Sequence, residues 1–188
     1  MVVNRDELIQ QLWETLQTIP QQPGHPWRTP VLATISLTGV PSVRTIVLRN
    51  VSAETFTLIA HTDVRSPKVA ELRANPDSEW LFYDPQSQVQ LRLRGETQVV
   101  TSGPDLEAAW DTTPILLRPN YASITPPSSP LEAPPNGLPP DTTEGKQNFA
   151  LLVAEINQLD WLQLNRHGHE RILFTRRDFS WTGTWITP

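Results

Sequence analysis

The chain has 188 residues, of which 38% are hydrophobic and 19% are charged, and its formal net charge is −5. This composition is typical of a globular protein that is long enough to bury a sizeable core. The negative charge argues against a nucleic-acid partner, because phosphate backbones bind basic surfaces. Since there is no cysteine, the sequence excludes disulfides, zinc–thiolate sites, iron–sulfur clusters and cysteine nucleophiles.

The N-terminal segment is polar and acidic rather than basic and then apolar, so we expect no secretory signal. No apolar run approaches the roughly 20 residues that a helix needs to cross a bilayer. We therefore expect a cytoplasmic protein with no membrane partner.

The first predicted element is a helix over residues 4–19. Asn4 is a favourable N-cap, and Glu7 occupies the capping-box position. Apolar residues follow at helical spacing and predict one buried face, formed by Leu8, Leu12, Leu16 and Ile19. Prolines at positions 20, 23, 26 and 30 then favour an extended connection.

From residue 31 onward the sequence predicts mostly strands. These cover residues 31–38, 42–51, 55–60, 79–83, 89–100, 150–156, 161–164, 171–175 and 180–186. Two short helices are predicted among them, over residues 66–74 with Ser66 as N-cap, and over residues 104–111. Several short strands with few helices indicate a mainly β, α+β fold, with an antiparallel sheet closed into a small barrel.

Residues 125–141 differ from the rest of the chain in composition. Seven prolines and little apolar content predict a loop without regular structure. Because strands resume after it, we expect this segment to lie within a single domain that covers residues 1–188.

Arg44 and Arg49 lie in an apolar, β-branched run, and strand alternation would place them on opposite faces. An edge strand protected by charge is one interpretation. The other is that Arg44 forks onto a phosphate and Arg49 binds a second anion. Downstream, Ser66 and Lys68 stand at a predicted helix start, close behind Thr62. Hydroxyl, ammonium and backbone N–H groups at such a position can hold an anion.

His167 and His169 form a His-x-His pair. Two imidazoles without a carboxylate cluster rarely suffice for a metal ion, so we predict no metal site and interpret the pair as part of a solvated turn. No nucleophile elbow, P-loop or dinucleotide fingerprint is present.

In order and spacing, these residues resemble the motifs of the pyridoxamine 5'-phosphate oxidase family. The first motif is two basic residues around an apolar run, at residues 44–49, and the second is His61-Thr62 followed by Ser66-x-Lys68. A strand glutamine matches Gln90, and a tryptophan and an arginine ten residues apart match Trp161 and Arg171.

The resemblance implies a six-stranded antiparallel split β-barrel that binds FMN as a homodimer. It implies that the cofactor is held by Arg44, Thr45, Ile46, Val47, Leu48, Arg49, His61, Thr62, Ser66, Lys68, Gln90, Trp161 and Arg171. Of these, Arg44, Thr62, Ser66 and Lys68 would bind the phosphate. The last three, beginning with Gln90, would come from the second subunit.

For a small-molecule substrate, the resemblance implies binding by Arg49, Arg118, His167 and His169. His167 stands where the family has an arginine, and Ser123 lies one place later than the family's serine after Arg118. No catalytic residue is assigned. Two hypotheses follow: an FMN-dependent oxidoreductase, or a flavin-binding protein without turnover that serves storage or sensing.

Overall fold

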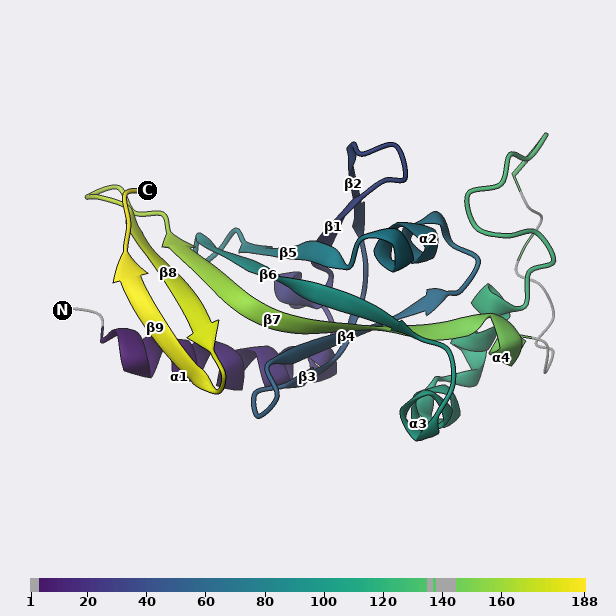
Figure 1. The fold of residues 1–188 in the computed structure, drawn as a ribbon, viewed down its shortest axis with the longest axis horizontal. Helices are drawn as coiled ribbons and strands as arrows, with labels where there is room; N and C mark the ends of the chain where they lie inside the picture. Colours follow the sequence, from purple (N-terminus) through teal and green to yellow (C-terminus); the bar gives the residue numbers. More distant parts are fainter. Residues whose placement is uncertain (1–3, 135–136, 138–144) are drawn as a thin grey trace.

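The computed structural model describes residues 4–134, 137 and 145–188 (Figure 1). Its centre is a nine-stranded antiparallel sheet. The strands are β1 (Val31–Ile35), β2 (Pro41–Thr45), β3 (Leu48–Ser52), β4 (Thr57–Asp63), β5 (Asp77–Asp84), β6 (Val89–Val100), β7 (Phe149–Gln163), β8 (Glu170–Arg177) and β9 (Ser180–Trp185). The mainly β fold is confirmed, with nine strands in place of the six that the resemblance implied. They include a β8–β9 hairpin that pairs onto the second half of β7.

The prediction of one strand over residues 42–51 is wrong. Its first half, β2, pairs with β1, and its second half, β3, pairs with β4. Between them the chain leaves one partner for the other, and the backbone N–H of Ile46 donates to the carbonyl of Pro30 at 3.0 Å. Local alternation continues through this break, so the sequence pattern does not reveal it.

This break shows that the sheet is bent so strongly that its two terminal strands come close to each other. The strand order is β2-β1-β5-β6-β7-β4-β3, so β2 and β3 lie at its two ends. Only Ile46 and Val47 separate them in the chain, and consecutive Cα atoms are about 3.8 Å apart. The two ends of the sheet therefore meet at residues 45–48, which we call the seam.

The predicted strands over residues 150–156 and 161–164 are one continuous strand, β7, which pairs with β4, β6 and β8. The residues between them have little β-propensity of their own, but the neighbouring strands on both sides supply their hydrogen bonds. A β-bulge between Arg94 and Gly95 shifts the register of β6 against β7. There a Cβ on Gly95 would lie 1.9 Å from the carbonyl oxygen of Glu155.

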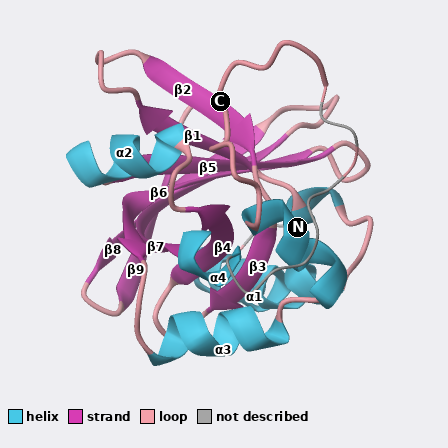
Figure 2. Cartoon of the chain, turned by 90° about the vertical axis from the view of Figure 1, so that its right-hand side faces the viewer, coloured by secondary structure: helices cyan, strands magenta, loops and turns pink. Residues whose placement is uncertain are grey.

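The helices pack on both sides of the sheet (Figures 1 and 2). They are α1 (Arg5–Thr18), α2 (Pro67–Ala74), α3 (Pro104–Thr112) and α4 (Gly145–Asn148), with short 3₁₀ turns η1 (Ile19–Gln21), η2 (Pro26–Arg28) and η3 (Ile115–Tyr121). Asn4 caps α1 as predicted, because its side chain accepts a hydrogen bond from the N–H of Asp6. Figure 2 shows α2 and α3 on opposite sides of the sheet.

Two groups of buried apolar side chains hold these layers together. The larger one packs α1 against the inner face of the sheet and includes Leu12, Trp13, Leu16 and Trp80. The smaller one lies beneath α3 and consists of Leu106, Trp110, Phe149 and Leu151. The second group places α3 over the first part of β7, where it forms one wall of the site described below.

Residues 125–134 have no helix or strand, as predicted for this proline-rich stretch. The rest of the predicted loop, residues 135–136 and 138–141, lies outside the described residues. Among the helices that the structure describes, none combines the length and apolar character needed to cross a membrane.

Candidate functional site

Arg44 lies at the end of β2, where β1 and α2 bring polar groups to it. Its guanidinium forms an ion pair with Glu71 of α2 at 2.8 Å and donates to the hydroxyls of Ser42 and Thr34. Glu71 also accepts a hydrogen bond from Thr34. Burial raises the pKa of Glu71, but the hydrogen bonds from Thr34 and Arg44 outweigh burial and leave the pKa below its ordinary value. Glu71 is therefore ionised at neutral pH.

Lys68 and Ser66 lie beside Arg44 at the start of α2. The Lys68 ammonium donates to the Ser66 hydroxyl at 2.6 Å, so that hydroxyl does not cap the helix as the sequence suggested. Burial lowers the pKa of Lys68, and the nearby charge of Arg44 lowers it further. Within the described residues Lys68 has no carboxylate partner within ion-pair distance. The structure thus brings together three of the four residues predicted to hold a phosphate.

The fourth, Thr62, is buried at the end of β4, and among the described residues its hydroxyl donates only to the carbonyl of Asp63, at 3.4 Å. Asp63 forms a two-point ion pair with Arg65, which also donates to the carbonyl of Ser123. Sequence reasoning missed Arg65 and Glu71. Both were ordinary charged residues of a turn and a helix, and only the tertiary structure gives them partners.

The seam carries the remaining predicted residues of the 44–49 motif. Thr45 is exposed, Val47 is half-buried, and Ile46 and Leu48 are buried. Thr45 pairs with Val31 of β1, whereas Leu48 pairs with Ala60 of β4. Residues 46 and 47 belong to neither strand. They connect the two terminal strands, so their position depends on how the whole sheet bends.

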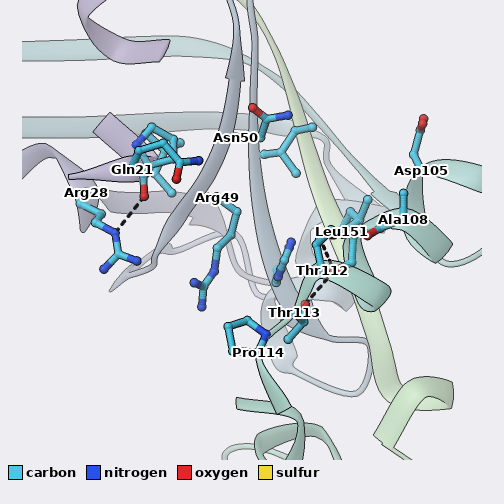
Figure 3. Close-up of a pocket in the computed structure, with 15 residues that line it drawn as sticks. Gln21, Arg28, Arg49, Asn50, Asp105, Ala108, Thr112, Thr113, Pro114 and Leu151 are labelled. Carbon is cyan, nitrogen blue, oxygen red and sulfur yellow. Dashed lines mark hydrogen bonds between the residues drawn. The ribbon is translucent and has the colours of Figure 1, made fainter. Parts of the chain in front are cut away.

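Arg49 and His61 face a cavity of about 640 Å³ between the seam side of the sheet and α3 (Figure 3). Arg28 of η2 lines the same cavity, which sequence reasoning did not suggest. Apolar side chains supply much of the remaining wall, among them Leu48, Ile59, Ala108, Ala109 and Leu151. A cavity of this size with a few polar groups is typical of a small-molecule site.

Two polar atoms at this cavity are buried without a partner among the described residues: Nε of Arg49 and Nδ1 of His61. Burial lowers the pKa of Arg49, and the charge of Arg28 lowers it further. Burial also lowers the pKa of His61 to about 4, with a second contribution from the charge of Arg49. At neutral pH the cavity therefore holds a neutral imidazole beside guanidinium cations.

Gln90, Trp161 and Arg171 lie together but far from the residues above. Gln90 pairs with Leu162, and Trp161 pairs with Ile172, near the end of β7. Arg171 forms a two-point ion pair with Asp160, and this hydrogen bonding raises the pKa of Arg171.

The separation follows from the register of β7. His61 pairs with Leu151, and Trp161 is ten residues further along the same strand. At about 3.3 Å per residue, this corresponds to roughly 30 Å of strand. The chain therefore does not bring its two groups of predicted cofactor residues to one place.

Arg118 and the two histidines also lie apart from the cavity lining. The Arg118 guanidinium donates to the carbonyls of Trp110, Asp111 and Thr113 at the end of α3, and it stacks over the Trp110 ring. His167 and His169 are exposed in the β7–β8 turn, where Nδ1 of His169 accepts from the N–H of Asn165. In the described part of the chain, no three His, Cys, Asp or Glu side chains cluster as metal ligands.

The chain is similar in sequence to a known family. Residues 10–101 match the family described as pyridoxamine 5'-phosphate oxidase, FMN-binding domain. Pyridoxine/pyridoxamine 5'-phosphate oxidase 2 of Arabidopsis thaliana is 30% identical over 172 residues, which cover 84% of this chain and 85% of the relative. The Xylella fastidiosa pyridoxine/pyridoxamine 5'-phosphate oxidase is 42% identical over 73 residues, which cover 37% of this chain and 34% of that protein.

Solved structures confirm the fold. A pyridoxamine 5'-phosphate oxidase-related, FMN-binding protein of Nostoc punctiforme is 25% identical with a TM-score of 0.75, and the match covers 100% of both chains. PhzG of Burkholderia lata, solved with tetrahydrophenazine-1-carboxylic acid, is 17% identical with a TM-score of 0.72, over 97% of this chain and 92% of that one. At that identity, the likeness to PhzG supports the fold alone.

Proposed function

Because this chain belongs to the pyridoxamine 5'-phosphate oxidase family of FMN-binding domains, we propose that it binds FMN and is an oxidoreductase acting on a small molecule. FMN, when bound, supplies the hydride and electron transfer, and the protein binds and orients the reactants.

The observation that carries the proposal is the cluster of Arg44, Ser66 and Lys68 at the start of α2. Two cations and one carboxylate, Glu71, leave this cluster with a net charge of +1, which favours an anion. The pKa of Lys68 is lowered because the ammonium is half-buried beside another cation. A phosphate monoester would supply the missing negative charge, so these residues fit the phosphate end of FMN.

The other groups would have separate roles. Backbone groups of the seam would contact the flavin ring, and Arg49 and His61 would face the substrate from the cavity. Gln90, Trp161 and Arg171 would reach the ring from a second copy of the chain, because they lie at the other end of β7. We therefore propose a homodimer with two FMN sites at the interface, each built from residues of both chains.

A flavin-binding protein without turnover is the second candidate, and two observations favour it. The family's substrate arginine at position 167 is a histidine. The Arg118 guanidinium donates to three backbone carbonyls at the end of α3 and does not line the cavity. The first observation removes a fixed positive charge that a phosphorylated substrate would use, and the second holds another such charge away from the cavity.

The test begins with the absorbance spectrum of the purified protein and the mass of the released cofactor. We expect FMN rather than FAD, because the cluster of Arg44, Ser66 and Lys68 fits a single phosphate group and the sequence has no dinucleotide-binding fingerprint. Bound FMN is then titrated anaerobically with pyridoxamine 5'-phosphate and other amines and alcohols. Reduction of the flavin supports the oxidoreductase, bound FMN that none of them reduces supports the second candidate, and the absence of FMN binding contradicts both.

A further inference from the structure

The Arg44 guanidinium already has three hydrogen-bond partners in the fold. Figure 2 shows α2 beside β1, and from α2 the side chain of Glu71 reaches Arg44. Nη2 of Arg44 donates to a carboxylate oxygen of Glu71 at 2.8 Å and to the hydroxyl of Ser42 at 2.6 Å. Nη1 donates to the hydroxyl of Thr34 at 2.5 Å. Both N–H groups of Nη2 are therefore in use, and within the described residues Nε–H and one N–H of Nη1 have no partner.

The two remaining donors cannot form the two-point contact that a phosphate makes with an arginine. A guanidinium has two pairs of parallel N–H groups, Nε with Nη2 and Nη1 with Nη2, because Cδ occupies the third side. Both pairs include Nη2, whose N–H groups bind Glu71 and Ser42. A phosphate that binds Arg44 in this two-point geometry must therefore displace one of these two partners.

Glu71 is the partner that has the same charge as a phosphate. Its side chain is only 8% exposed, and the Thr34 hydroxyl donates at 2.5 Å to the same carboxylate oxygen that Arg44 contacts. The hydrogen bonds from Thr34 and Arg44 keep the pKa of Glu71 below its ordinary value, so the group is charged at neutral pH. Ser42 is neutral, and its hydroxyl can rotate to another partner. The Glu71 carboxylate and a phosphate thus offer like charges to one cation.

We propose that Glu71 competes with the phosphate for Arg44 and so determines how tightly this cluster binds a phosphate monoester. The inference rests on the proposed function, since it concerns the phosphate end of that site. Exchanging one anion for another on Arg44 gains less free energy than pairing a lone cation, because Arg44 already has a charged partner. Lys68, whose described partner is the Ser66 hydroxyl, supplies the positive charge that Glu71 leaves unneutralised.

The test is calorimetric titration of the purified protein, after removal of any bound flavin, with FMN, riboflavin and inorganic phosphate. Riboflavin is FMN without its phosphate, so it reports binding of the ring and ribityl chain, and inorganic phosphate reports the phosphate position alone. The variants are Glu71→Gln, which removes the charge at nearly constant size, and Glu71→Asp, which keeps the charge on a shorter side chain. Glu54→Gln is the control, because it removes the same charge from an exposed position in the β3–β4 turn.

We expect Glu71→Gln to bind FMN and inorganic phosphate about tenfold more tightly than the wild type, because a negative charge close to the phosphate is removed. The affinity for riboflavin should not change. Glu71→Asp should bind FMN with an affinity between those of the wild type and Glu71→Gln, because the shorter carboxylate holds Nη2 less well, and this variant gives an answer even if Glu71→Gln does not fold. Glu54→Gln should bind all three probes as the wild type does.

Three results would overturn the inference. These are an FMN affinity in the Glu71 variants no higher than in the wild type, equal tightening for FMN and riboflavin, and equal tightening in Glu71→Gln and Glu54→Gln. If the wild type binds FMN and the Glu71 variants bind it no more tightly, the proposed function stands and only this inference fails. If the protein binds neither flavin but its affinity for inorganic phosphate rises in Glu71→Gln, the proposed function fails and this inference stands.

Discussion

Arg44 connects the proposed phosphate site to a local ion pair. Replacing it by alanine should weaken FMN binding by about 2–3 kcal/mol, the value of a charged hydrogen bond that is lost. It should also lower the free energy of unfolding, because the mostly buried carboxylate of Glu71 loses its cation. Flavin fluorescence titration and urea unfolding measure the two effects.

The double variant Arg44→Ala/Glu71→Gln separates binding from stability. Removing the uncompensated negative charge should restore most of the lost stability. FMN affinity should stay low, since the phosphate still lacks its guanidinium. If affinity returns together with stability, Arg44 supports only the local structure and the phosphate assignment is wrong.

His61 should make the stability of the protein depend on pH. Its pKa is lowered from 6.5 to about 4, so between these values the unfolded chain binds a proton that the folded chain does not. The free energy of unfolding should therefore fall as pH falls through this window. The drop should be smaller in His61→Gln, in which this group no longer titrates. Thermal unfolding of both proteins from pH 7 to pH 4 is the measurement, and parallel curves would contradict the prediction.

At the scale of elements, the bulge of β6 depends on Gly95. A Cβ at this position would lie 1.9 Å from a carbonyl oxygen of the neighbouring strand, and backbone cannot move away as a flexible side chain can. Gly95→Ala should therefore cost about 3 kcal/mol or more in urea unfolding. Glu96→Ala changes the next, exposed residue of the same strand and should stay within about 0.5 kcal/mol of the wild type. Similar losses in both variants would show that the close approach is relieved elsewhere.

Elements whose signal is local could be predicted from the sequence. Asn4 caps α1 and the helical spacing of Leu12 and Leu16 identifies its buried face, because both effects act within a few residues. The break at Ile46 and the continuity of β7 could not be predicted. They depend on which distant strands supply hydrogen bonds, and alternation along the chain carries no information about partners.

The candidate site likewise contains residues that the sequence could predict and residues that it could not. Arg44, Ser66 and Lys68 were predicted together and lie together. Glu71, Arg28 and Asp160 were missed, because each acquires its role from a residue distant in sequence or from a cavity that exists only in the fold. Motif spacing predicted that Arg44, Ser66 and Lys68 lie together, but not which groups surround them.

At the scale of the whole molecule, the proposed dimer follows from the length of β7. Residues proposed for one flavin lie near both ends of this strand, roughly 30 Å apart along it. In a dimer, the end of β7 that carries Trp161 in one chain would lie beside the start of β7 in the other chain. The β1–β2 hairpin also exposes apolar side chains, namely Leu37, Val40 and Val43. Exposed apolar groups that lie together are typical of protein interfaces.

This arrangement predicts that two defective chains can restore one site. In Arg44→Ala, each site lacks the phosphate guanidinium, and in Arg171→Ala, each lacks the group contributed by the other subunit. In a mixed dimer both defects fall in one site, and the other site combines intact Arg44 from one chain with intact Arg171 from its partner. We therefore expect mixed dimers, isolated with two different affinity tags, to bind one FMN per dimer at near wild-type affinity.

The homodimers of each variant are the controls, and both should bind FMN weakly at every site. Because Arg171 also forms an ion pair with Asp160, Arg171→Lys serves as a second variant that keeps the local charge while it removes the two-point geometry. Mixed dimers as weak as the parent variants would show that each site is built within a single chain. A monomer in light scattering that holds one FMN would contradict the dimer directly, because one chain would then have to use residues separated by most of the length of β7.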